Sequence, residues 1–370
     1  MNINRTVVAG AISTVLAVGL VGCGQVPKPP KPTASPSTPT PSSTSTSTPT
    51  PTPTLTPTGT PTSSPTGSST PSGTPTSTPS VTPTTTPPVT STGFYDFPNN
   101  QVDEWVQNNP NDGRMPAIRD GIANHPASLW VGGDWTSNGA AVKTMVEAAK
   151  AADKMPVVVL YNIPGRDCGG YSSGGAGSSA AYKTWATQVA GQIGNNPVTV
   201  IVEPDAIAQA VANGCQLDKT NLKHAVTELK KNPNAKVYLD AGNAYWPSNN
   251  TTLAAALTEA GVAQADGFAL NTSNFNTNAE SKTKGNAISA LVGNKHYVID
   301  TSRNGNGAAA GGAWCNPPGR AVGVPATTNT GSTLVDAYLW VKLAGESDGN
   351  CNGGPNAGQF SAALAYDLVD

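Results

Sequence analysis

Short runs of apolar residues, each of strand length, recur beyond residue 93. They are SLWVG near residue 128, MPVVVLY ending at Tyr161, VTVIV at 198–202, KVYL ending at Leu239, GFAL at 267–270, HYVI at 296–299 and AYLWV at 337–341. The segments between them carry apolar residues at helical spacing, such as GAAVKTMVEAAKAA, AAYKTWATQVAGQI, TNLKHAVTELKK, LAAALTEAGV and AISALVG. Apolar strands that alternate with amphipathic helices are typical of a parallel sheet covered by helices. Seven such units favour a barrel over an open sheet, so the pattern predicts an α/β fold, a seven-stranded parallel β/α barrel.

The segment from Val26 to Thr92 has a different pattern. It is almost entirely Pro, Thr and Ser, and no charged residue occurs between Pro32 and Tyr95. Such a segment cannot bury a core, so we predict a disordered Pro/Thr/Ser linker, about 200 Å long at most at roughly 3.1 Å per residue. Its hydroxyl groups make it a candidate for O-glycosylation. All Trp, Tyr and Phe residues lie from Phe94 onward, which places the folded domain at 94–370.

The chain begins MNINRTVVAGAISTVLAVGLVGC, in which Arg5 precedes an apolar run that ends in Leu-Val-Gly-Cys. This pattern is typical of a bacterial lipoprotein signal, in which residues 1–22 are removed and Cys23 is lipidated. A plain signal peptide or a membrane helix is a weaker interpretation, because the apolar run is short for spanning a bilayer. We therefore predict that residues 23–93 tether an extracellular domain to the cell surface through the lipid on Cys23.

The composition limits the possible partners. The formal net charge is −2 and no cluster of Lys or Arg occurs, which argues against nucleic acid as a partner. Only 12% of the residues are charged, whereas Asn, Ser, Thr and Gly are plentiful, and such a surface suits a neutral polar ligand. We expect contact with a membrane only through the N-terminal lipid, and we expect a monomer.

The folded domain contains few residues that bind metals. An even number of cysteines in an exported domain predicts two disulfides, and the sequence alone allows three pairings. The four cysteines are Cys168, Cys215, Cys315 and Cys351. Their spacings fit no zinc motif, and the three histidines lack the spacing of metal ligands. We therefore expect neither a metal ion nor a cofactor.

Carboxylates and amides gather where the predicted strands end, at the edge that carries the active site in parallel α/β architectures. Any single Asp there is equally well explained as the N-cap of the helix that follows. Capping does not explain the whole set, because aromatic residues and amides accompany the acids. The set comprises Trp130, Tyr161, Asp167, Glu203, Asp205, Asp240, Asn271, Asn274, Asp300, Lys342, Glu346 and Asp348.

Several sequence blocks lie around these residues. They are VVVLYNIPGRDCGGYSSGG, VIVEPDAIA, VYLDAGNAYW, NTSNF, IDTSRNG, WCNPPGRAVG and LWVKLAGESDGNC. In this order they resemble successive blocks of glycoside hydrolase family 6, the cellulases once called family B, over essentially all of residues 94–370. The resemblance implies a distorted seven-stranded α/β barrel that hydrolyses β-1,4-glucan with inversion of anomeric configuration. Inversion requires a protonated carboxyl at the leaving oxygen and the deprotonation of a water on the opposite face.

By this resemblance Asp205, in VEPDAIA, is the acid that protonates the leaving group. Such an acid must hold its proton near neutral pH, which requires an apolar setting or nearby like charges. Asp205 follows an apolar strand, and we expect Glu203, Asp167 and Asp240 to raise its pKa.

The resemblance also assigns the glycine-rich segment after Tyr161. It implies that Asp167 keeps the acid protonated and helps relay the proton of the water, and that Ser173 holds this water from a loop that moves over the sugar. Tyr161 favours distortion of the sugar ring at the cleavage point. Asp348 is a candidate base, an assignment that is disputed in the family and stays open. The implied disulfides are Cys168–Cys215 and Cys315–Cys351.

Sugar rings bind by stacking their C–H faces on aromatic rings, while amides and charged groups fix the hydroxyls. The residues that the resemblance assigns to substrate binding are Trp130, Asp240, Trp246, Asn274, Trp314, Lys342 and Glu346. Asn243 joins them, although the family usually has His at this position; an amide can hydrogen-bond a sugar but cannot titrate. We expect Trp105, Trp185 and Trp340 to pack in the core.

Other functions fit less well. GYSSG at 170–174 matches the G-x-S-x-G of esterases around Ser172, but that motif requires a sharp turn directly between a strand and a helix. Gly305-Asn306-Gly307 imitates a dinucleotide loop, but further glycines interrupt the helix that should follow. A carbohydrate-binding protein without activity is disfavoured because the rim carboxylates are present. Only 22 residues follow Asp348, so an endoglucanase is favoured over a cellobiohydrolase, whose long loops enclose the glucan in a tunnel.

Overall fold

The computed structural model describes residues 93–98, 100–133 and 135–370. The predicted signal peptide, the predicted lipidation site at Cys23 and the linker up to residue 92 lie outside the described residues. Of the helices within the described ranges, none combines the length and the apolar character that crossing a bilayer requires.

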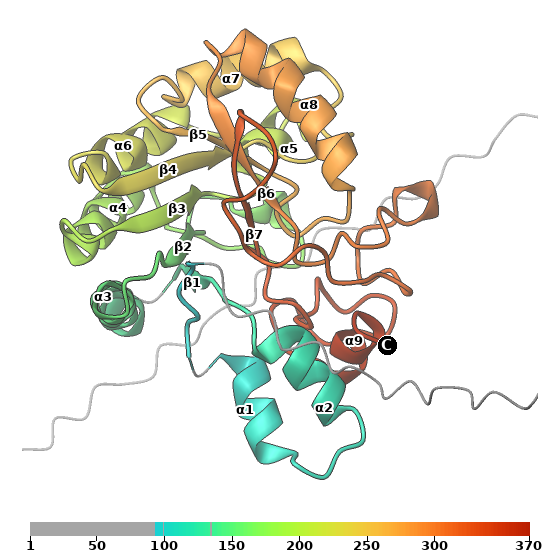
Figure 1. Cartoon of the computed structure of the whole chain (residues 1–370). Coiled ribbons are helices and arrows are strands. Elements are labelled where there is room, and N and C mark those ends of the chain that lie inside the picture. The colour runs from blue at the N-terminus through green and yellow to red at the C-terminus, as the bar shows by residue number, and fades with distance from the viewer. Residues whose placement is uncertain (1–92, 99, 134) are drawn as a thin grey trace, which may run out of the picture. The chain divides into compact units, whose positions relative to one another are not determined.

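Seven strands form one parallel sheet, in which each strand pairs with the next strand of the chain. Their bounds are β1 Leu129–Val131, β2 Val157–Leu160, β3 Val198–Val202, β4 Ala235–Asp240, β5 Gly267–Leu270, β6 His296–Asp300 and β7 Val335–Leu339. The sheet curls in Figure 1 into a half-barrel that helices surround. The predicted seven-stranded parallel β/α architecture is confirmed.

The bounds of β7 differ from those of the predicted strand. The apolar run suggested 337–341, but the strand begins at Val335 and includes Asp336. This carboxylate accepts a hydrogen bond from the Tyr238 hydroxyl (2.7 Å) and pairs with His296 Nδ1 (2.7 Å). Because its polar atoms are satisfied, an acidic residue is tolerated inside a strand.

Side chains, rather than a backbone ladder, connect the two ends of the sheet. In the described part of the chain, β1 pairs only with β2 and β7 pairs only with β6. The hydroxyl of Ser128 and Nε1 of Trp130 both donate to the carbonyl of Val341, at 2.6 and 2.8 Å. The gap between β1 and β7 is therefore a seam held by two side chains, which is the distortion that the family resemblance implied.

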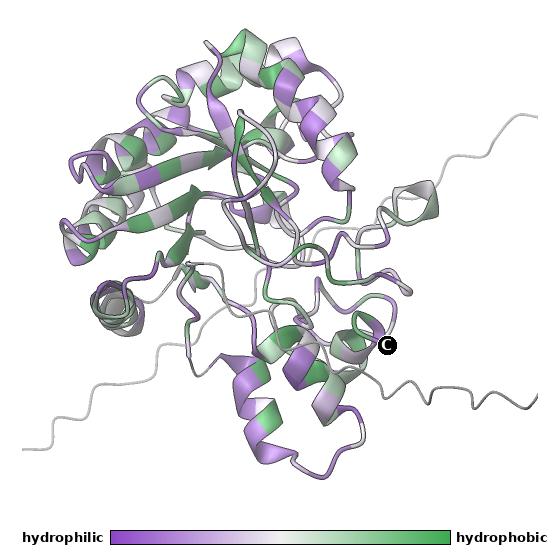
Figure 2. Cartoon of the chain, viewed as in Figure 1, coloured by the Kyte–Doolittle hydropathy of each residue, from purple (hydrophilic) through white to green (hydrophobic). Residues whose placement is uncertain are grey.

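The strands are buried on both faces, as their continuous apolar runs predict. In β2, Val157 and Val159 belong to a cluster enclosed by the curled sheet, while Val158 and Leu160 pack in the larger cluster under the surrounding helices. Figure 2 shows that the strands are mostly hydrophobic, while the helices around them carry both hydrophobic and hydrophilic residues. The two clusters hold the strand ends, and therefore the loops that follow them, in fixed positions.

Five of the helices correspond to the segments predicted from helical spacing, namely α3, α4, α6, α7 and α8. The bounds are α1 Gln101–Asn108, α2 Met115–Ile118, α3 Trp135–Ala151, α4 Ser179–Ile193, α5 Ala206–Asn213, α6 Lys219–Leu229, α7 Asn250–Glu259, α8 Asn278–Leu291 and α9 Ala362–Asp367. Short helical turns occupy Arg119–Ala123, Asp167–Gly169 and Ala310–Gly312.

Helices α1, α2 and α9 form a separate group beside the sheet (Figure 1). They pack around Trp340 through apolar side chains that include Val102, Ile118 and Leu368. Trp340 and Trp185 are both 5% exposed, as we expected for core tryptophans, and Trp105 packs partly buried against the same group. This group supports the loop after β7 from below.

Candidate active site

A groove of about 550 Å³ opens at the C-terminal edge of the sheet. Each of the seven strands, or the loop after it, contributes to its walls. Ten of the predicted site residues line it: Trp130, Tyr161, Asp167, Asp205, Asn243, Trp246, Asn274, Trp314, Lys342 and Asp348. Three do not: Ser173, Asp240 and Glu346. Most of the predicted site residues therefore share one groove, whereas Asn271 and Asp300 of the predicted rim are buried and do not line it.

Asp205 lies between β3 and α5 with a φ of 69°, in the left-handed region that non-glycine residues rarely adopt. It stands at the N-cap position of α5, yet its side chain makes no capping hydrogen bond. Its backbone N–H donates to Oδ1 of Asp240 at 3.0 Å. The carboxyl of Asp205 is thus not used for capping, and it lines the groove.

The surroundings of Asp205 favour its protonated form. Burial raises the pKa of Asp205 well above its usual range, and the negative charges of Asp240, Asp167 and Asp348 raise it further. Burial also raises the pKa of Asp240, to about 6. A carboxyl that keeps its proton near neutral pH has the property that a general acid requires.

Asp240 lies beneath the groove rather than in it. We predicted that it contacts sugar, but it is 1% exposed, and its Oδ1 accepts hydrogen bonds from the N–H groups of Asp205 and Gly242, both at 3.0 Å. Its position as the last residue of β4, the strand that pairs with β3, explains this. Its contacts fit a positioning residue for Asp205.

Glu203 has a different role from the one expected. The carboxylate accepts hydrogen bonds from the N–H groups of Asn162 (2.9 and 3.0 Å) and Ile163 (2.9 Å), at the start of the loop after β2. Burial raises its pKa to about 7. We expected its charge to raise the pKa of Asp205, but the charges that do so are those of other carboxylates, because Glu203 is directed to the β2 loop.

The glycine-rich loop after β2 is fixed at the end that carries Asp167. Oδ2 of Asp167 accepts from the N–H of Ser172 (2.7 Å), and Oδ1 accepts from Nε2 of Gln209 on α5 (3.1 Å). The backbone of Asp167 is left-handed, with a φ of 58°. Ser173 is exposed and lies outside the groove lining in this arrangement of the loop.

Arg166, which the sequence analysis did not select, holds this loop together. Its Nε donates to the carbonyl of Ser172 (2.7 Å) and its Nη1 to the carbonyl of Tyr161 (2.7 Å). The guanidinium also lies 4.8 Å from the centre of the Tyr161 ring. That ring meets Trp130 edge to face, with centres 5.2 Å apart. Arg166 therefore connects the loop at Ser172 to Tyr161, which lines the groove.

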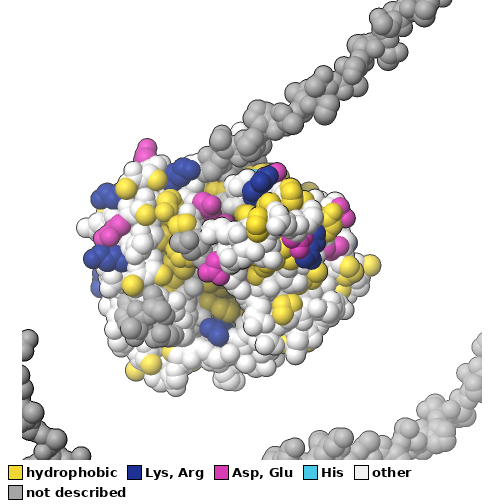
Figure 3. Space-filling model, turned by 90° about the horizontal axis from the view of Figure 1, so that it is seen from below, with side chains coloured by type: hydrophobic (Ala, Val, Ile, Leu, Met, Phe, Trp, Pro, Cys, Tyr) yellow, Lys and Arg dark blue, Asp and Glu magenta, His cyan; other side chains and the backbone are white. Residues whose placement is uncertain are grey.

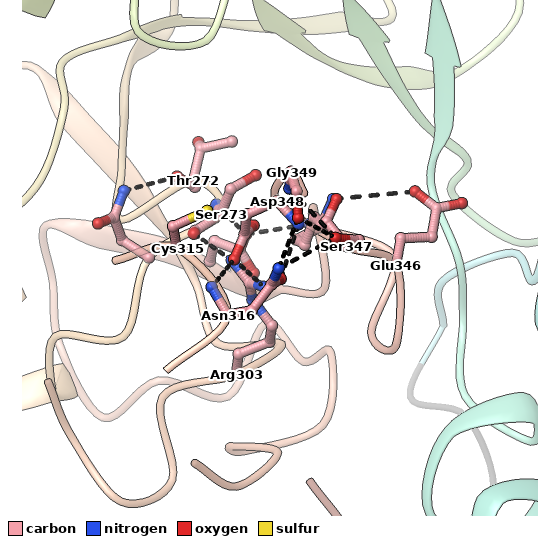
Figure 4. Close-up of polar contacts among 12 residues, drawn as sticks. Thr272, Ser273, Arg303, Cys315, Asn316, Glu346, Ser347, Asp348 and Gly349 are labelled. Carbon is pink, nitrogen blue, oxygen red and sulfur yellow. Dashed lines mark hydrogen bonds and ion pairs between the residues drawn. The ribbon is translucent and has the colours of Figure 1, made fainter. Parts of the chain in front are cut away.

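Asp348 on the opposite wall forms a buried ion pair with Arg303. Nη1 and Nη2 of Arg303 donate to its two carboxylate oxygens at 3.0 and 2.9 Å, and the N–H of Asn316 donates to Oδ2 at 3.0 Å. The side chains of the pair are only 4% and 7% exposed. Figure 4 shows Arg303, Asn316 and Ser347 gathered around Asp348. Both oxygens of this carboxylate are therefore occupied.

Lys342 lines the groove, and Glu346 supports it from behind. Oε1 of Glu346 accepts from Nε2 of Gln101 on α1 (2.7 Å), while its Oε2 is 3.9 Å from Nζ of Lys342. Burial raises the pKa of Glu346 to about 7 and lowers the pKa of Lys342. Glu346 was predicted to bind substrate, but it does not line the groove, because α1 covers it.

Asn243, the residue that replaces the usual His of the family, organises a turn. Its Oδ1 accepts from the N–H groups of Tyr245 and Trp246, both at 3.1 Å, and its Nδ2 donates to Oδ1 of Asn274 at 3.2 Å. Nε1 of Trp246 in turn donates to Asn213 (3.3 Å). Asn243 therefore positions the aromatic residues of this wall as well as lining it.

Both predicted disulfides are present. Cys168–Cys215 has a Cα–Cα distance of 5.9 Å and joins the β2 loop to the end of α5. Cys315–Cys351 has a Cα–Cα distance of 6.2 Å and joins the segment after Trp314 to the loop after β7. Each disulfide anchors a loop that forms a wall of the groove.

The described domain matches a known protein family over its whole length. Residues 92–370 match the model of glycosyl hydrolases family 6. The chain belongs to this family. Among curated family 6 relatives, endoglucanase 1 of Streptomyces halstedii is 43% identical over 291 residues, which are 75% of this chain and 89% of that protein. Endoglucanase A of Cellulomonas fimi is 48% identical over 284 residues, and the chain spans only 61% of that longer protein.

Solved family 6 structures have the same fold. The structure titled as the endoglucanase Cel6 from Mycobacterium tuberculosis, in complex with methyl-cellobiosyl-4-deoxy-4-thio-β-D-cellobioside, is 42% identical with a TM-score of 0.69, over 76% of this chain and 98% of that one. The endoglucanase CEL6B from Humicola insolens is 24% identical with a TM-score of 0.63, over 76% of this chain and 96% of that one, and it supports the fold alone.

Family 6 membership leaves the two motif matches without a role. Ser172 donates its N–H to Asp167, and the segment from the end of β2 at Leu160 to the start of α4 at Ser179 is far longer than an esterase turn. The loop at 305–307 leads into a short turn at Ala310–Gly312, not into a helix that binds a dinucleotide. Both matches are ordinary loop sequence.

The surface of this family 6 domain is weakly charged. Charged side chains of both signs are scattered among uncharged ones on the face in Figure 3. Within the described ranges, no group of three His, Cys, Asp or Glu side chains is placed to hold a metal ion. Such a surface suits a neutral polymer as ligand.

Proposed function

We propose that this protein is an endo-1,4-β-glucanase, which hydrolyses internal bonds of cellulose or related β-glucans with inversion of configuration. The observation that carries the proposal is Asp205, uncapped and lining a groove that all seven strands help to form, where burial and neighbouring carboxylates raise its pKa. The endoglucanases among its relatives, at 41–48% identity, support the same activity.

In the proposed reaction, the carboxyl of Asp205 donates its proton to the glycosidic oxygen as the bond breaks. A water attacks the anomeric carbon from the opposite face and loses a proton. Tyr161 lines the groove against Trp130, and we assign to it the distortion of the sugar ring at the cleavage point. Burial and the charge of Asp167 raise the pKa of the Tyr161 hydroxyl, so it stays a neutral donor.

We assign removal of the water's proton to a relay toward Asp167, in which Ser173 holds the water. Asp348 is less suited to direct proton removal, because its carboxylate is held in a buried ion pair with the Arg303 guanidinium, whereas the oxygens of Asp167 accept only from the uncharged donors of Ser172 and Gln209. Ser173 lies outside the groove lining, so the relay needs a movement of the loop that Arg166 holds. Asp348 acts through its charge, which raises the pKa of Asp205.

Substrate binding follows from the groove lining. We propose that Trp130, Trp246 and Trp314 stack on glucosyl rings, and Trp314, 56% exposed, is the most accessible of the large aromatic residues on its wall. The groups proposed to bind sugar hydroxyls are Asn243, Asn274 and Lys342. Glu346 acts through Lys342, which it holds in place.

The test is stereochemical, with proton NMR of a β-glucan digest within the first minutes. Inversion predicts that the α-anomer of the new reducing end appears first, before mutarotation. An initial β-anomer contradicts the mechanism, and absence of any reducing end supports a binding protein without activity. A rapid fall in the viscosity of carboxymethylcellulose identifies endo-action. The second candidate, a cellobiohydrolase, is supported by relatives at 32–33% identity and predicts cellobiose with little loss of viscosity.

We also propose that the enzyme is a monomer held outside the cell by a lipid on Cys23 and a tether of residues 23–93. The signal pattern at residues 1–22 and the two disulfides of the domain support an exported protein. Mass spectrometry of the purified N-terminal peptide tests this, since a diacylglycerol on Cys23 is expected. The Cys23→Ser variant cannot carry the lipid, so we expect it to be released into the medium.

A further inference from the structure

Tyr245 is an exposed aromatic residue that lines the groove and that neither the sequence pattern nor the family resemblance selected. It is 64% exposed, the highest value among the large hydrophobic side chains of the described residues. Other tyrosines, such as Tyr182 and Tyr297, are fully buried. A ring that keeps its face in water within a binding groove is available to a ligand.

The backbone of Tyr245 is held by the turn that Asn243 forms. Its N–H donates to Oδ1 of Asn243 at 3.1 Å, and the N–H of Asn243 donates to the carbonyl of Trp246 at 2.7 Å. Tyr245 therefore stands directly before Trp246 in a closed turn, and both side chains line the same groove.

The other end of the side chain is held by a different element. The Tyr245 hydroxyl donates to Oε1 of Glu280 on α8 at 2.6 Å. Glu280 is itself fixed, because its Oε2 accepts from the N–H (2.8 Å) and the hydroxyl (2.7 Å) of Thr277 in the capping box that begins α8. An exposed ring is thereby kept in one orientation without being buried.

This arrangement suits a flat apolar ligand surface that carries polar groups at its edge, which describes a pyranose ring. Fixing the ring in advance reduces the entropy that binding costs. The neighbouring carboxylate of Glu280 adds an acceptor for hydroxyl groups. The ring itself contributes little to stability by burial, because most of its surface stays in water.

We propose that Tyr245, oriented by Glu280, forms an additional glucosyl-binding site next to Trp246, occupied by a sugar unit of a bound β-1,4-glucan. This inference rests on the proposed function, since it assumes that the groove binds a glucan. It predicts that the enzyme gains affinity from chain length through a residue that takes no part in bond cleavage.

Calorimetric binding of non-hydrolysable thio-linked cello-oligosaccharides of three to six units tests the site without the reaction. Tyr245→Ala is expected to weaken binding of the longest oligosaccharide by about 5- to 20-fold, as expected for loss of one stacking contact. Binding of the shortest oligosaccharide that occupies the cleavage point is expected to stay within twofold. Tyr245→Phe, which keeps the ring but loses the bond to Glu280, is expected to show a smaller loss. Leu291→Ala, at the exposed end of α8, is the control.

Two outcomes overturn the inference. Unchanged affinity at every length removes Tyr245 from binding. An equal loss at every length, together with a lower melting temperature, means that Tyr245 only supports the turn. If the unsubstituted protein binds none of the oligosaccharides, the proposed function fails instead.

Discussion

Two opposite walls of the groove each carry an aspartate. The two carboxyl groups differ in their hydrogen bonds and in the charges around them. Asp205, after β3, stands at the start of a helix that it does not cap, and burial and like charges raise its pKa. Asp348, after β7, has both oxygens bound by a guanidinium and a backbone N–H.

The difference shows how one residue type serves two purposes. A carboxyl without partners in a partly dry site retains its proton and can donate it, whereas a carboxylate in a buried ion pair is bound to its neighbours. In this groove the surroundings of an aspartate, and not the residue type, decide whether its carboxyl can donate a proton or is held in a supporting ion pair. The predictions below test that separation.

The largest effect is expected from Asp205→Asn. The amide fills the same space but cannot donate the proton, so kcat on unactivated β-glucans is expected to fall by about 10²–10⁴-fold. Affinity for oligosaccharides, measured by calorimetry, should stay nearly intact. Because the raised pKa of Asp205 makes its ionised form unfavourable in the folded protein, the variant should be at least as stable as the parent at pH 8. A loss below tenfold removes Asp205 from the role of acid.

Asp348→Asn should mainly lower the stability of the fold, whereas Asp205→Asn should mainly lower kcat. It leaves the Arg303 guanidinium buried without its counter-charge, and unfolding in urea is expected to show a loss of about 3–5 kcal/mol. The matched control is Asp112→Asn, which breaks a similar two-bond pair with Arg114 that is exposed, and little change is expected there. Equal stability of the two variants contradicts the comparison.

Glu346→Gln allows a comparison with Asp348 in the same loop after β7. Within the described residues Glu346, unlike Asp348, makes no ion pair with a guanidinium. Its pKa rises to about 7 on folding from an ordinary value near 4.5. A group with a raised pKa stabilises the folded state below its unfolded pKa, and this contribution is lost as the pH rises through 7. Between pH 4.5 and 8 the variant should therefore lose about 1–3 kcal/mol less stability than the parent. If the stability of the variant and that of the parent change equally with pH across this range, the prediction is wrong.

Asp240→Asn should give the smallest effect, a shift in the pH profile. Activity requires protonated Asp205, so it is lost as the pH rises through the raised pKa of that acid. Removing the charge of Asp240 lowers this pKa, and the alkaline limb of kcat/KM should move to lower pH. The ratio of activity at pH 8 to that at pH 5 should fall by about threefold. Asp120→Asn, on the surface, serves as control.

The strands and long helices were predictable because their patterns reflect burial. VTVIV and GFAL became β3 and β5 with the predicted bounds. The pattern failed where a polar side chain is satisfied inside an element, as Asp336 is in β7. It also missed α1, α2 and α9, which are short and stabilised by packing around Trp340.

The sequence could predict which residues belong to the site, but not which of them line the groove and which lie behind it. Residue types and family blocks placed ten side chains in the groove, yet the sequence could not show that Asp240 and Glu346 lie behind it. Whether a side chain lines the groove or lies behind it depends on which segment covers it. Such coverage comes from contacts between residues far apart in the sequence, such as the one from Gln101 to Glu346. Arg166 was missed because its role lies in hydrogen bonds to backbone carbonyls, which leave no mark in residue spacing.

The order of the strands has a consequence for how the molecule is made. Each strand pairs with the one just before it in the chain, so during synthesis every new strand meets an edge that already exists. Within the described residues, hydrogen bonds from Ser128 and Trp130 to Val341 cross between the two ends of this series, and they form only once the segment after β7 is made. Until β7 arrives, the edge of β6 is open to other chains, as the edge of each earlier strand is before its successor pairs with it. Asp205, the proposed acid, is therefore made early, whereas the groove is complete only with the last strand and the loop after it.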